Sequence, residues 1–286
     1  MYNIVVSGAS SGIGAAIALD LCRNGHKVIV CARRLQRLKE LFSAEHKALI
    51  VQCDVSDIDS VRGLADFSRE HFDSVDVLIN CAGIIGAVGP FYTTCPNAWM
   101  EAFRVNVFGT YAVSHAMVPM LRNSEHHPRI INFSGGGAFN PFPNMSAYAA
   151  SKAAIIRLTE NQAVELADIG ICVNAVAPGF VNTDIHDQVL IAGVDNIGRG
   201  YYDEIIRKKA DGSAVDISIP VACVNFLLSD AAIGLTGKTL SASFDPWAEP
   251  MFSSLIQEIN KSDVYTMRRI NVRNLSSSDK LKILDR

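Results

Sequence analysis

Tyr148 and Lys152 are the residues of this sequence whose types and spacing could perform chemistry together. In a helix, side chains four residues apart lie on one face, so a helix here would direct both into the same space. A phenol ordinarily titrates near pH ~10 and exchanges protons poorly at neutral pH. A neighbouring ammonium stabilises the phenolate and lowers the pKa of the phenol, so the pair predicts a proton-transfer site. Because this spacing is common on helices, the surrounding elements must decide its meaning.

A glycine-rich segment near the N-terminus predicts a binding site for a dinucleotide. Residues 7–14 read Ser-Gly-Ala-Ser-Ser-Gly-Ile-Gly and follow an apolar run at residues 3–6. A helical pattern then ends at Asn24-Gly25, and a second apolar run occupies residues 27–32. This is strand, glycine turn, helix, strand, and a helix N-terminus binds phosphate through free N–H groups and its dipole. A tight turn alone would explain one glycine but not three at this spacing.

The residues that close the second strand favour NADP(H) over NAD(H). An acidic side chain at this position would bind the adenosine ribose and select NAD. Here Ala32 is followed by Arg33 and Arg34, and a guanidinium suits a 2′-phosphate. We assign Arg33 to the phosphate, whereas Arg34 could simply be a surface residue that starts the next helix.

Strand-like and helix-like segments continue to alternate along the chain. This alternation predicts an α/β fold: a single Rossmann-type, doubly wound domain over residues 1–250, with a mostly parallel seven-stranded sheet and helices on both faces. A long helix is expected over residues 97–122, bent or interrupted at Pro119. Another is expected over residues 148–168. The pattern loosens at 184–218, which we interpret as a mobile substrate cap, and residues 251–286 form a C-terminal extension. The further strands are expected at 48–53, 75–80, 129–134, 171–176 and 238–243.

Composition excludes several classes of partner. The formal net charge is −3 and 49% of the residues are hydrophobic, which gives no reason to expect nucleic acid or a membrane surface. We find no apolar run of about 18 residues and no signal peptide, so a cytoplasmic protein is expected. The seven cysteines lack C-x-x-C spacing, which favours reduced thiols over disulfides, and no metal site is predicted.

Six motifs follow one another in a fixed order. Their order and spacing resemble the short-chain dehydrogenase/reductase (SDR) superfamily over about residues 1–250. Ser7 replaces a threonine of the family pattern, and Cys81 replaces its second asparagine. The motifs are Ser7-Gly8 through Gly14, Asp54-Val55, Asn80-Cys81-Ala82-Gly83, Asn106, Tyr148 with Lys152, and Pro178-Gly179 with Thr183.

The resemblance implies an oxidoreductase that interconverts a carbonyl and a secondary alcohol by hydride transfer. Tyr148 would act as the acid or base, and Lys152 would bind the nicotinamide ribose and tune Tyr148. Asn106 would hold a proton-relaying water. The partner would be a small carbonyl or alcohol substrate, and a homodimer or homotetramer would form on the two long helices. The implied cofactor-binding residues are Gly8, Ser10, Ser11, Gly12, Ile13, Gly14, Arg33, Asp54, Val55, Asn80, Ala82, Gly83, Tyr148, Lys152, Pro178, Gly179, Val181 and Thr183.

One departure from the family concerns its catalytic serine, which usually lies thirteen residues before the tyrosine. That position is Gly135 here, and Ser134 precedes it. Neighbouring strand residues point to opposite faces, so Ser134 could face the core. Loss of such a hydrogen-bond donor can cost on the order of 10²–10³ in rate. We rank Ser134 or a backbone donor first as the replacement and complete loss second. Ser146 is a further candidate that could also be a helix cap.

A second departure is the extension beyond residue 250. It could be a subunit-contact or packing tail. A sharper hypothesis is that Trp247 or the pair Arg268-Arg269 reaches the site and binds an anionic substrate. The cap residues that could contact an aromatic or acidic ligand, or lie on the surface, are Tyr201, Tyr202, Arg207, Lys208 and Lys209.

Two other functions remain open at this point. Gly135 motivates a non-catalytic NADP-binding sensor or scaffold, although a sensor has no need of Tyr148, Lys152 and Asn106 together. An isomerase or lyase that regenerates its own nicotinamide would often carry a longer substrate domain, for which this chain lacks room.

Overall fold

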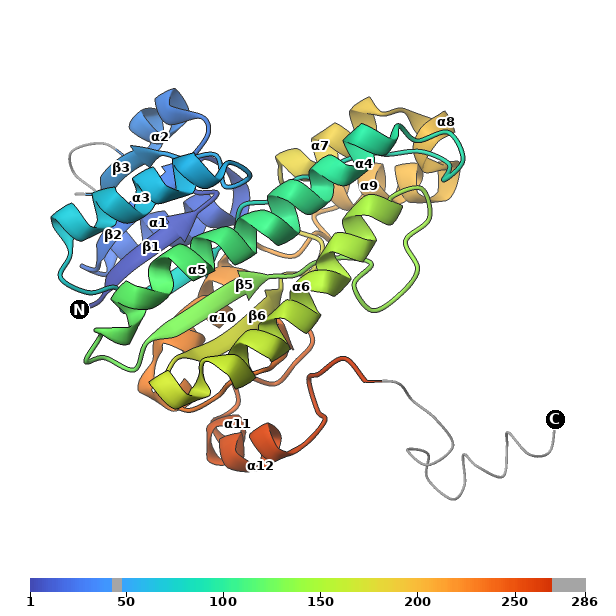
Figure 1. The fold of residues 1–286 in the computed structure, drawn as a ribbon. Coiled ribbons are helices and arrows are strands. Elements are labelled where there is room, and N and C mark those ends of the chain that lie inside the picture. The colour runs from blue at the N-terminus through green and yellow to red at the C-terminus, as the bar shows by residue number, and fades with distance from the viewer. Residues whose placement is uncertain (43–47, 269–286) are drawn as a thin grey trace, which may run out of the picture.

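The computed structural model describes residues 1–42 and 48–268 and is built around a seven-stranded parallel sheet (Figure 1). The strands run in the order β3-β2-β1-β4-β5-β6-β7, and every pairing is parallel. The predicted fold class is confirmed. The strands are β1 (Asn3–Ser7), β2 (Lys27–Ala32), β3 (Leu49–Gln52), β4 (Val77–Asn80), β5 (Arg129–Phe133), β6 (Cys172–Ala177) and β7 (Thr239–Ser241).

The central strands are apolar on both faces because helices cover both sides of the sheet. In β1, Ile4, Val5 and Val6 are each fully buried, as expected for a parallel strand within such a layer. Successive connections run outward in one direction from β1 to β3 and in the other from β4 to β7. The reversal lies between β1 and β4, and ligands of open α/β sheets bind beside the carboxyl ends of strands at such a point.

Two helical layers form separate cores with the sheet. The core on the face of α1 includes Leu21, Leu227 and Phe252, whereas the opposite core includes Leu64 and Met117. The chain beyond residue 250 therefore packs on the same core as the first helix. The helices of the first face are α1 (Gly12–Arg23), α2 (Leu35–Leu41), α10 (Ser218–Leu228), α11 (Pro250–Ser254) and α12 (Ile256–Lys261). Those of the second face are α3 (Ile58–His71), α5 (Gly109–Arg122) and α6 (Ser146–Glu165).

The long helix expected over residues 97–122 is interrupted, but not at Pro119. It consists of α4 (Pro96–Phe103), a π-helical turn η2 (Arg104–Phe108) and α5, which continues past Pro119. The helix is therefore not interrupted at Pro119. A π turn inserts an extra residue into the helix and often marks a functional position, and Asn106 lies within this one.

Residues 184–210 fold into three helices instead of the loose segment that the sequence pattern indicated. They are α7 (Asp184–Ile191), α8 (Val194–Ile197) and α9 (Arg199–Ala210), and they lie beyond the carboxyl ends of the strands (Figure 1). Their apolar residues Val189, Ile197 and Ile205 form a third cluster with Ile85 and Met145. Two short 3₁₀ turns, η3 (Ala167–Ile169) and η4 (Asp230–Ala232), complete the described elements.

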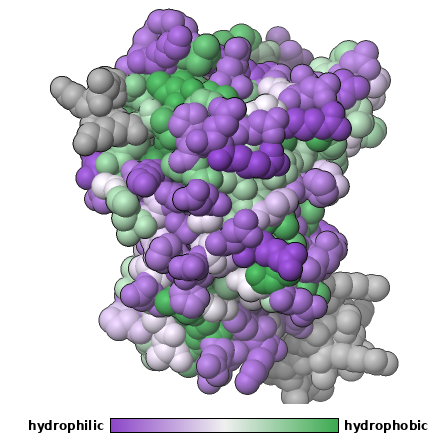
Figure 2. Space-filling model, turned by 60° about the vertical axis from the view of Figure 1, so that its left-hand side comes forward, coloured by the Kyte–Doolittle hydropathy of each residue, from purple (hydrophilic) through white to green (hydrophobic). Residues whose placement is uncertain are grey.

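Hydrophilic residues surround smaller hydrophobic patches on the face shown in Figure 2. No helix within residues 1–42 and 48–268 combines the length and the apolar character needed to cross a membrane. All seven cysteines are free thiols.

Candidate active site

Two cavities meet at Tyr148. The first, of about 250 Å³, lies at the carboxyl ends of the strands beside the glycine turn. The second, of about 520 Å³, lies beneath the cap helices. Tyr148, Ile13, Pro178, Thr183 and Ile185 line both cavities. A ligand in either cavity can therefore approach the tyrosine.

The glycine turn forms one wall of the first cavity because the backbones there approach too closely for a side chain. A Cβ on Gly8 would lie 2.6 Å from the Ala82 backbone, and one on Gly14 would lie 2.5 Å from the Gly8 carbonyl oxygen. Gly8 also has a φ of +72°, which favours glycine. Of the predicted cofactor residues, those lining this cavity are Gly8, Ser10, Ser11, Gly12, Ile13, Gly14, Arg33, Val55, Ala82, Gly83, Tyr148, Lys152, Pro178 and Thr183.

Four predicted cofactor residues lie elsewhere. Gly179 and Val181 line the second cavity. The Asp54 carboxylate accepts hydrogen bonds from the backbone N–H and hydroxyl of Ser56, at 3.0 and 2.6 Å. The Asn80 amide donates to Ser114 Oγ at 2.9 Å and to Asn132 Oδ1 at 3.0 Å, so it is directed beneath α5 and α6. Neither Asp54 nor Asn80 is a lining residue of the first cavity.

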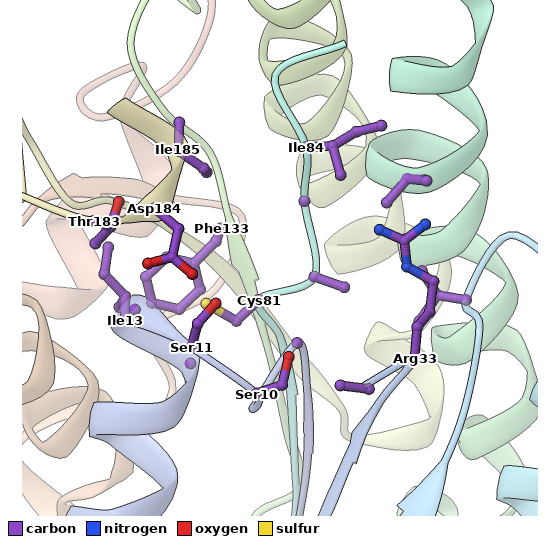
Figure 3. Close-up of a pocket in the computed structure, with 18 of the residues that line it drawn as sticks. Ser10, Ser11, Ile13, Arg33, Cys81, Ile84, Phe133, Thr183, Asp184 and Ile185 are labelled. Carbon is purple, nitrogen blue, oxygen red and sulfur yellow. The ribbon is translucent and has the colours of Figure 1, made fainter. Parts of the chain in front are cut away.

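The two arginines after β2 have different surroundings. The Arg34 guanidinium donates to Ser10 Oγ at 3.0 Å and Ser11 Oγ at 2.7 Å, and forms an ion pair with Asp184 at 3.7 Å. Within the described chain, no hydrogen bond or ion pair engages the Arg33 guanidinium. Figure 3 shows it beside the cavity on the side of Ile84, opposite Asp184.

The sequence interpretation treated Arg34 as a possible surface residue, but Arg34 lines the cavity together with Asp184, Cys81 and Gln188. None of these was predicted. An arginine pair offers no local pattern that distinguishes the two positions, and Asp184 is distant in sequence from the glycine turn.

Tyr148 and Lys152 share one face of α6, where Lys152 is buried and Tyr148 is half-buried. Lys152 Nζ donates to the Phe133 carbonyl at 2.9 Å and lies 5.6 Å from the centre of the Tyr148 ring. Burial lowers the pKa of Lys152 to about 8. Burial also raises the pKa of Tyr148 well above its ordinary value, with smaller contributions from Tyr201 and Cys81.

In this structure the pKa of the phenol is raised by burial, whereas the spacing to Lys152 predicted a downward shift. Desolvation disfavours the charged form of each group. It destabilises both the charged ammonium of Lys152 and the phenolate of Tyr148. The phenol is protonated at neutral pH.

The Ser134 hydroxyl is directed at α6. It donates to the Lys152 carbonyl at 3.2 Å, and the side chain is only 2% exposed. The Tyr148 hydroxyl instead lies against Gly135, where a Cβ would be 2.6 Å from Tyr148 Oη. The other candidate, Ser146, accepts a hydrogen bond from Trp99 Nε1 at 3.0 Å. The space of the family's serine is thus taken by the phenol itself.

Asn106 ties three segments together. Its Oδ1 accepts from the Ile84 N–H at 2.8 Å, and its Nδ2 donates to the Ile84 carbonyl at 2.9 Å and to Ser151 Oγ at 2.8 Å. Ser151 in turn donates to the Tyr148 carbonyl at 2.7 Å. Both amide hydrogens are committed, which leaves one lone pair of Oδ1 for the water that the resemblance implies.

The hypothesis that Trp247 or Arg268 reaches the site and binds an anionic substrate is wrong. Trp247 Nε1 donates to the Ala242 carbonyl at 3.0 Å, and Arg268 binds Glu160 and Asp263 at 3.1 and 2.7 Å. Neither side chain lines either cavity. Arg269 lies outside the described residues. Of the five cap residues named above, Tyr201 lines the second cavity.

A parallel sheet with a glycine turn at its switch point defines a nucleotide-binding α/β protein. The model of the short chain dehydrogenase family matches residues 2–192. The chain therefore belongs to the short chain dehydrogenase family and is an oxidoreductase.

Several relatives found by comparison are named reductases. Versicolorin reductase stcU of Emericella nidulans is 34% identical over 246 residues, covering 82% of this chain and 92% of that protein. The 3-oxoacyl-[acyl-carrier-protein] reductase FabG of Staphylococcus aureus is 34% identical over 244 residues, covering 83% and 95%. A crystal structure of actinorhodin polyketide ketoreductase with NADPH has a TM-score of 0.75 and 30% identity, covering 84% and 95%. The sensor alternative gains no support from these proteins.

The position of the Tyr148 hydroxyl predicts the effect of restoring the family's serine. Gly135→Ser places a Cβ 2.6 Å from Tyr148 Oη and must displace the phenol. We expect kcat/KM for a carbonyl substrate to fall by on the order of 10²-fold. Gly136→Ala is the matched control, because its Cβ meets Phe142 at an ordinary 3.6 Å and should change kcat/KM only a few-fold. Increased activity of Gly135→Ser would contradict the displacement.

The buried ammonium predicts a cost in stability. The fall in the pKa of Lys152 from 10.5 to about 8 corresponds to about 3 kcal/mol, and losing the bond to Phe133 offsets about 1 kcal/mol. Lys152→Met should therefore raise the free energy of unfolding by about 2 kcal/mol at pH 7, measured by urea denaturation. The penalty on the wild type is complete below pH 8 and disappears as the pH rises to 10.5. A gain that is equal at pH 7 and pH 10 would exclude this cause.

Proposed function

We propose that this chain is an NADP(H)-dependent oxidoreductase that interconverts a carbonyl and a secondary alcohol. The observation that carries the proposal is the place of Tyr148, which lines both the cavity beside the glycine turn and the cavity beneath the cap. When bound, NADPH supplies the hydride. The first cavity would hold the cofactor, and the second would hold the substrate. The relative crystallised with NADPH supports this cofactor for our chain.

Tyr148 is the proton donor in this scheme. Its hydroxyl is protonated at neutral pH, as donation to a carbonyl oxygen requires, but burial raises its pKa and so makes it a weaker acid until the phenolate is stabilised. Lys152 lies close enough to stabilise the phenolate that remains. Asn106 holds the π turn against α6 through Ser151, so we assign it a positioning role together with the water site.

The serine of the family has no direct substitute at its position. Ser134 lines the first cavity, but its hydroxyl hydrogen is donated to the Lys152 carbonyl. We propose that Ser134 orients α6 through that bond. The substrate oxygen would then be bound by Tyr148, with a backbone N–H of the segment 135–137 as the second donor.

The cofactor-binding roles follow from the walls of the first cavity. The glycine turn would hold the pyrophosphate at the N-terminus of α1. Arg33, whose guanidinium is without a described partner, would bind the 2′-phosphate, and Arg34 would brace the serines of the turn. Thr183 would contact the nicotinamide, since it lies where the two cavities join.

We also propose that the protein assembles as a homodimer or homotetramer. Phe108, Tyr111 and Val164 on the η2–α5 and α6 surfaces are 39%, 47% and 78% exposed. Apolar side chains on two long helices are a suitable contact between copies.

Removal of the phenolic hydroxyl tests the function. Tyr148→Phe should lower kcat with NADPH and a carbonyl substrate by 10²–10⁴-fold, a range typical of general acid catalysis. Titration of cofactor fluorescence should show that NADPH still binds. Full turnover by the variant would refute the acid role. A wild type that binds NADPH but reduces no member of a broad carbonyl panel would establish the sensor reading.

Cofactor preference tests the role of Arg33. Arg33→Ser should raise the KM for NADPH by about 10–100-fold, corresponding to the loss of one charged contact, and leave the KM for NADH nearly unchanged. Arg37→Ser is the control, because Arg37 forms a surface ion pair with Asp184 at 3.9 Å and does not line the cavity. A wild type that prefers NADH would refute the assignment.

A further inference from the structure

Residues Ser262–Arg268, which we call the C-terminal strap, are bound along the last strand of the sheet. Lys238 Nζ donates to the carbonyls of Ser262 and Val264 at 2.7 and 3.2 Å. The Thr239 N–H donates to the Tyr265 carbonyl at 2.8 Å. The strap therefore occupies hydrogen-bonding positions at the edge strand that would otherwise lack partners.

The strap is also anchored to α6, the helix of Tyr148. The buried Glu160 carboxylate accepts from the Met267 N–H at 2.6 Å and from Arg268 at 3.1 Å. Arg157 pairs with Glu160 as well and donates to the Met267 carbonyl at 2.8 Å. Removing a buried carboxylate from water is costly unless it is paired, so these contacts hold the strap in one position.

Between these two anchors the strap forms part of the wall of the second cavity. Tyr265 and Thr266 line it together with Ser241, Phe244 and Asp245. The Asp245 carboxylate accepts from the Ser241 N–H at 2.6 Å, and burial raises its pKa. The walls nearer the cap are apolar or aromatic, including Phe142, Val189 and Tyr201.

The charged side chain that lines the second cavity is a carboxylate. Neither a lysine nor an arginine is among its described lining residues, and Asp245 is the acidic residue there. His186 lines the cavity, but burial lowers its pKa to about 4, so it is neutral at pH 7. Two cap lysines lie close to this wall without lining the cavity: Lys208 pairs with Glu204 and stacks on Phe180, and Lys209 pairs with Asp187.

We propose that Asp245 and the strap form a specificity wall that admits neutral carbonyl compounds and rejects those carrying a carboxylate or phosphate. The inference rests on the proposed function, since it assigns a substrate class to the cavity beside Tyr148. A carboxylate in a partly buried wall that no lysine or arginine lines repels an anionic ligand and has no such effect on a neutral one. The strap contributes by covering that wall, which limits screening by solvent.

A pair of ketones of equal shape and different charge tests the wall. We would measure kcat/KM for para-acetylbenzamide and para-acetylbenzoate with NADPH, and their dissociation constants by calorimetry with NADP⁺, under which no turnover occurs. The wild type should favour the amide by about tenfold or more. Asp245→Asn retains an oxygen for the Ser241 N–H and should reduce this preference to about twofold by improving only the benzoate.

Two matched controls separate the wall from general effects. Asp195→Asn makes the same change in net charge at an exposed cap position and should leave the preference intact. A chain ending at Lys261 loses the strap and should lose the preference, whereas a chain ending at Arg268 should keep it. Preference for the benzoate in the wild type, or an unchanged ratio in Asp245→Asn, would overturn the proposal. Binding discrimination without reduction of either ketone would support the wall and count against the proposed catalysis.

Discussion

The burial of Lys152 beside the half-buried Tyr148 is the constraint on which the rest of the structure depends. The two ionisable side chains lie on one face of a helix, and the ammonium is bound by the Phe133 carbonyl. Desolvation raises the pKa of Tyr148 and lowers the pKa of Lys152, so each shift favours the neutral form of the group. A charge placed in either adjoining cavity would therefore shift the pKa values of both groups. Such sensitivity is typical of a proton-transfer site.

The position of α6 is secured by polar contacts beneath it as well as by apolar packing. Asn132 donates to Thr159 Oγ1 at 2.9 Å and to Gln162 Oε1 at 3.0 Å, and it accepts from Asn80. This network fixes the helix in register with β5, because buried polar groups are stable only when their partners are in place. Asn80, which the sequence assigned to a cofactor, thus belongs to the network that supports α6.

The described part of the chain beyond residue 250 is continuous with this arrangement. Phe252 and Ile256 complete the core on the face of α1, and the following strap returns to α6 through Glu160. The same helix therefore carries Tyr148 and Lys152 near its start and the contacts that hold the strap near its end. Such a connection lets the C-terminal segment define a cavity in its own subunit.

The sequence by itself determined the fold and most of the residues that line the cavity beside the glycine turn, because these depend on local patterns. Alternating apolar runs define the strands, and the spacing of Gly8, Gly12 and Gly14 reports where backbones must approach closely. The tertiary structure alone decided which way individual side chains point. Ser134 and Gly135 are neighbours in sequence, yet the phenol lies against one and the helix carbonyl binds the other. The sequence likewise could not give the direction of the Tyr148 pKa shift. Burial depends on residues that the fold brings around the phenol, and the helical spacing of two residues does not report it.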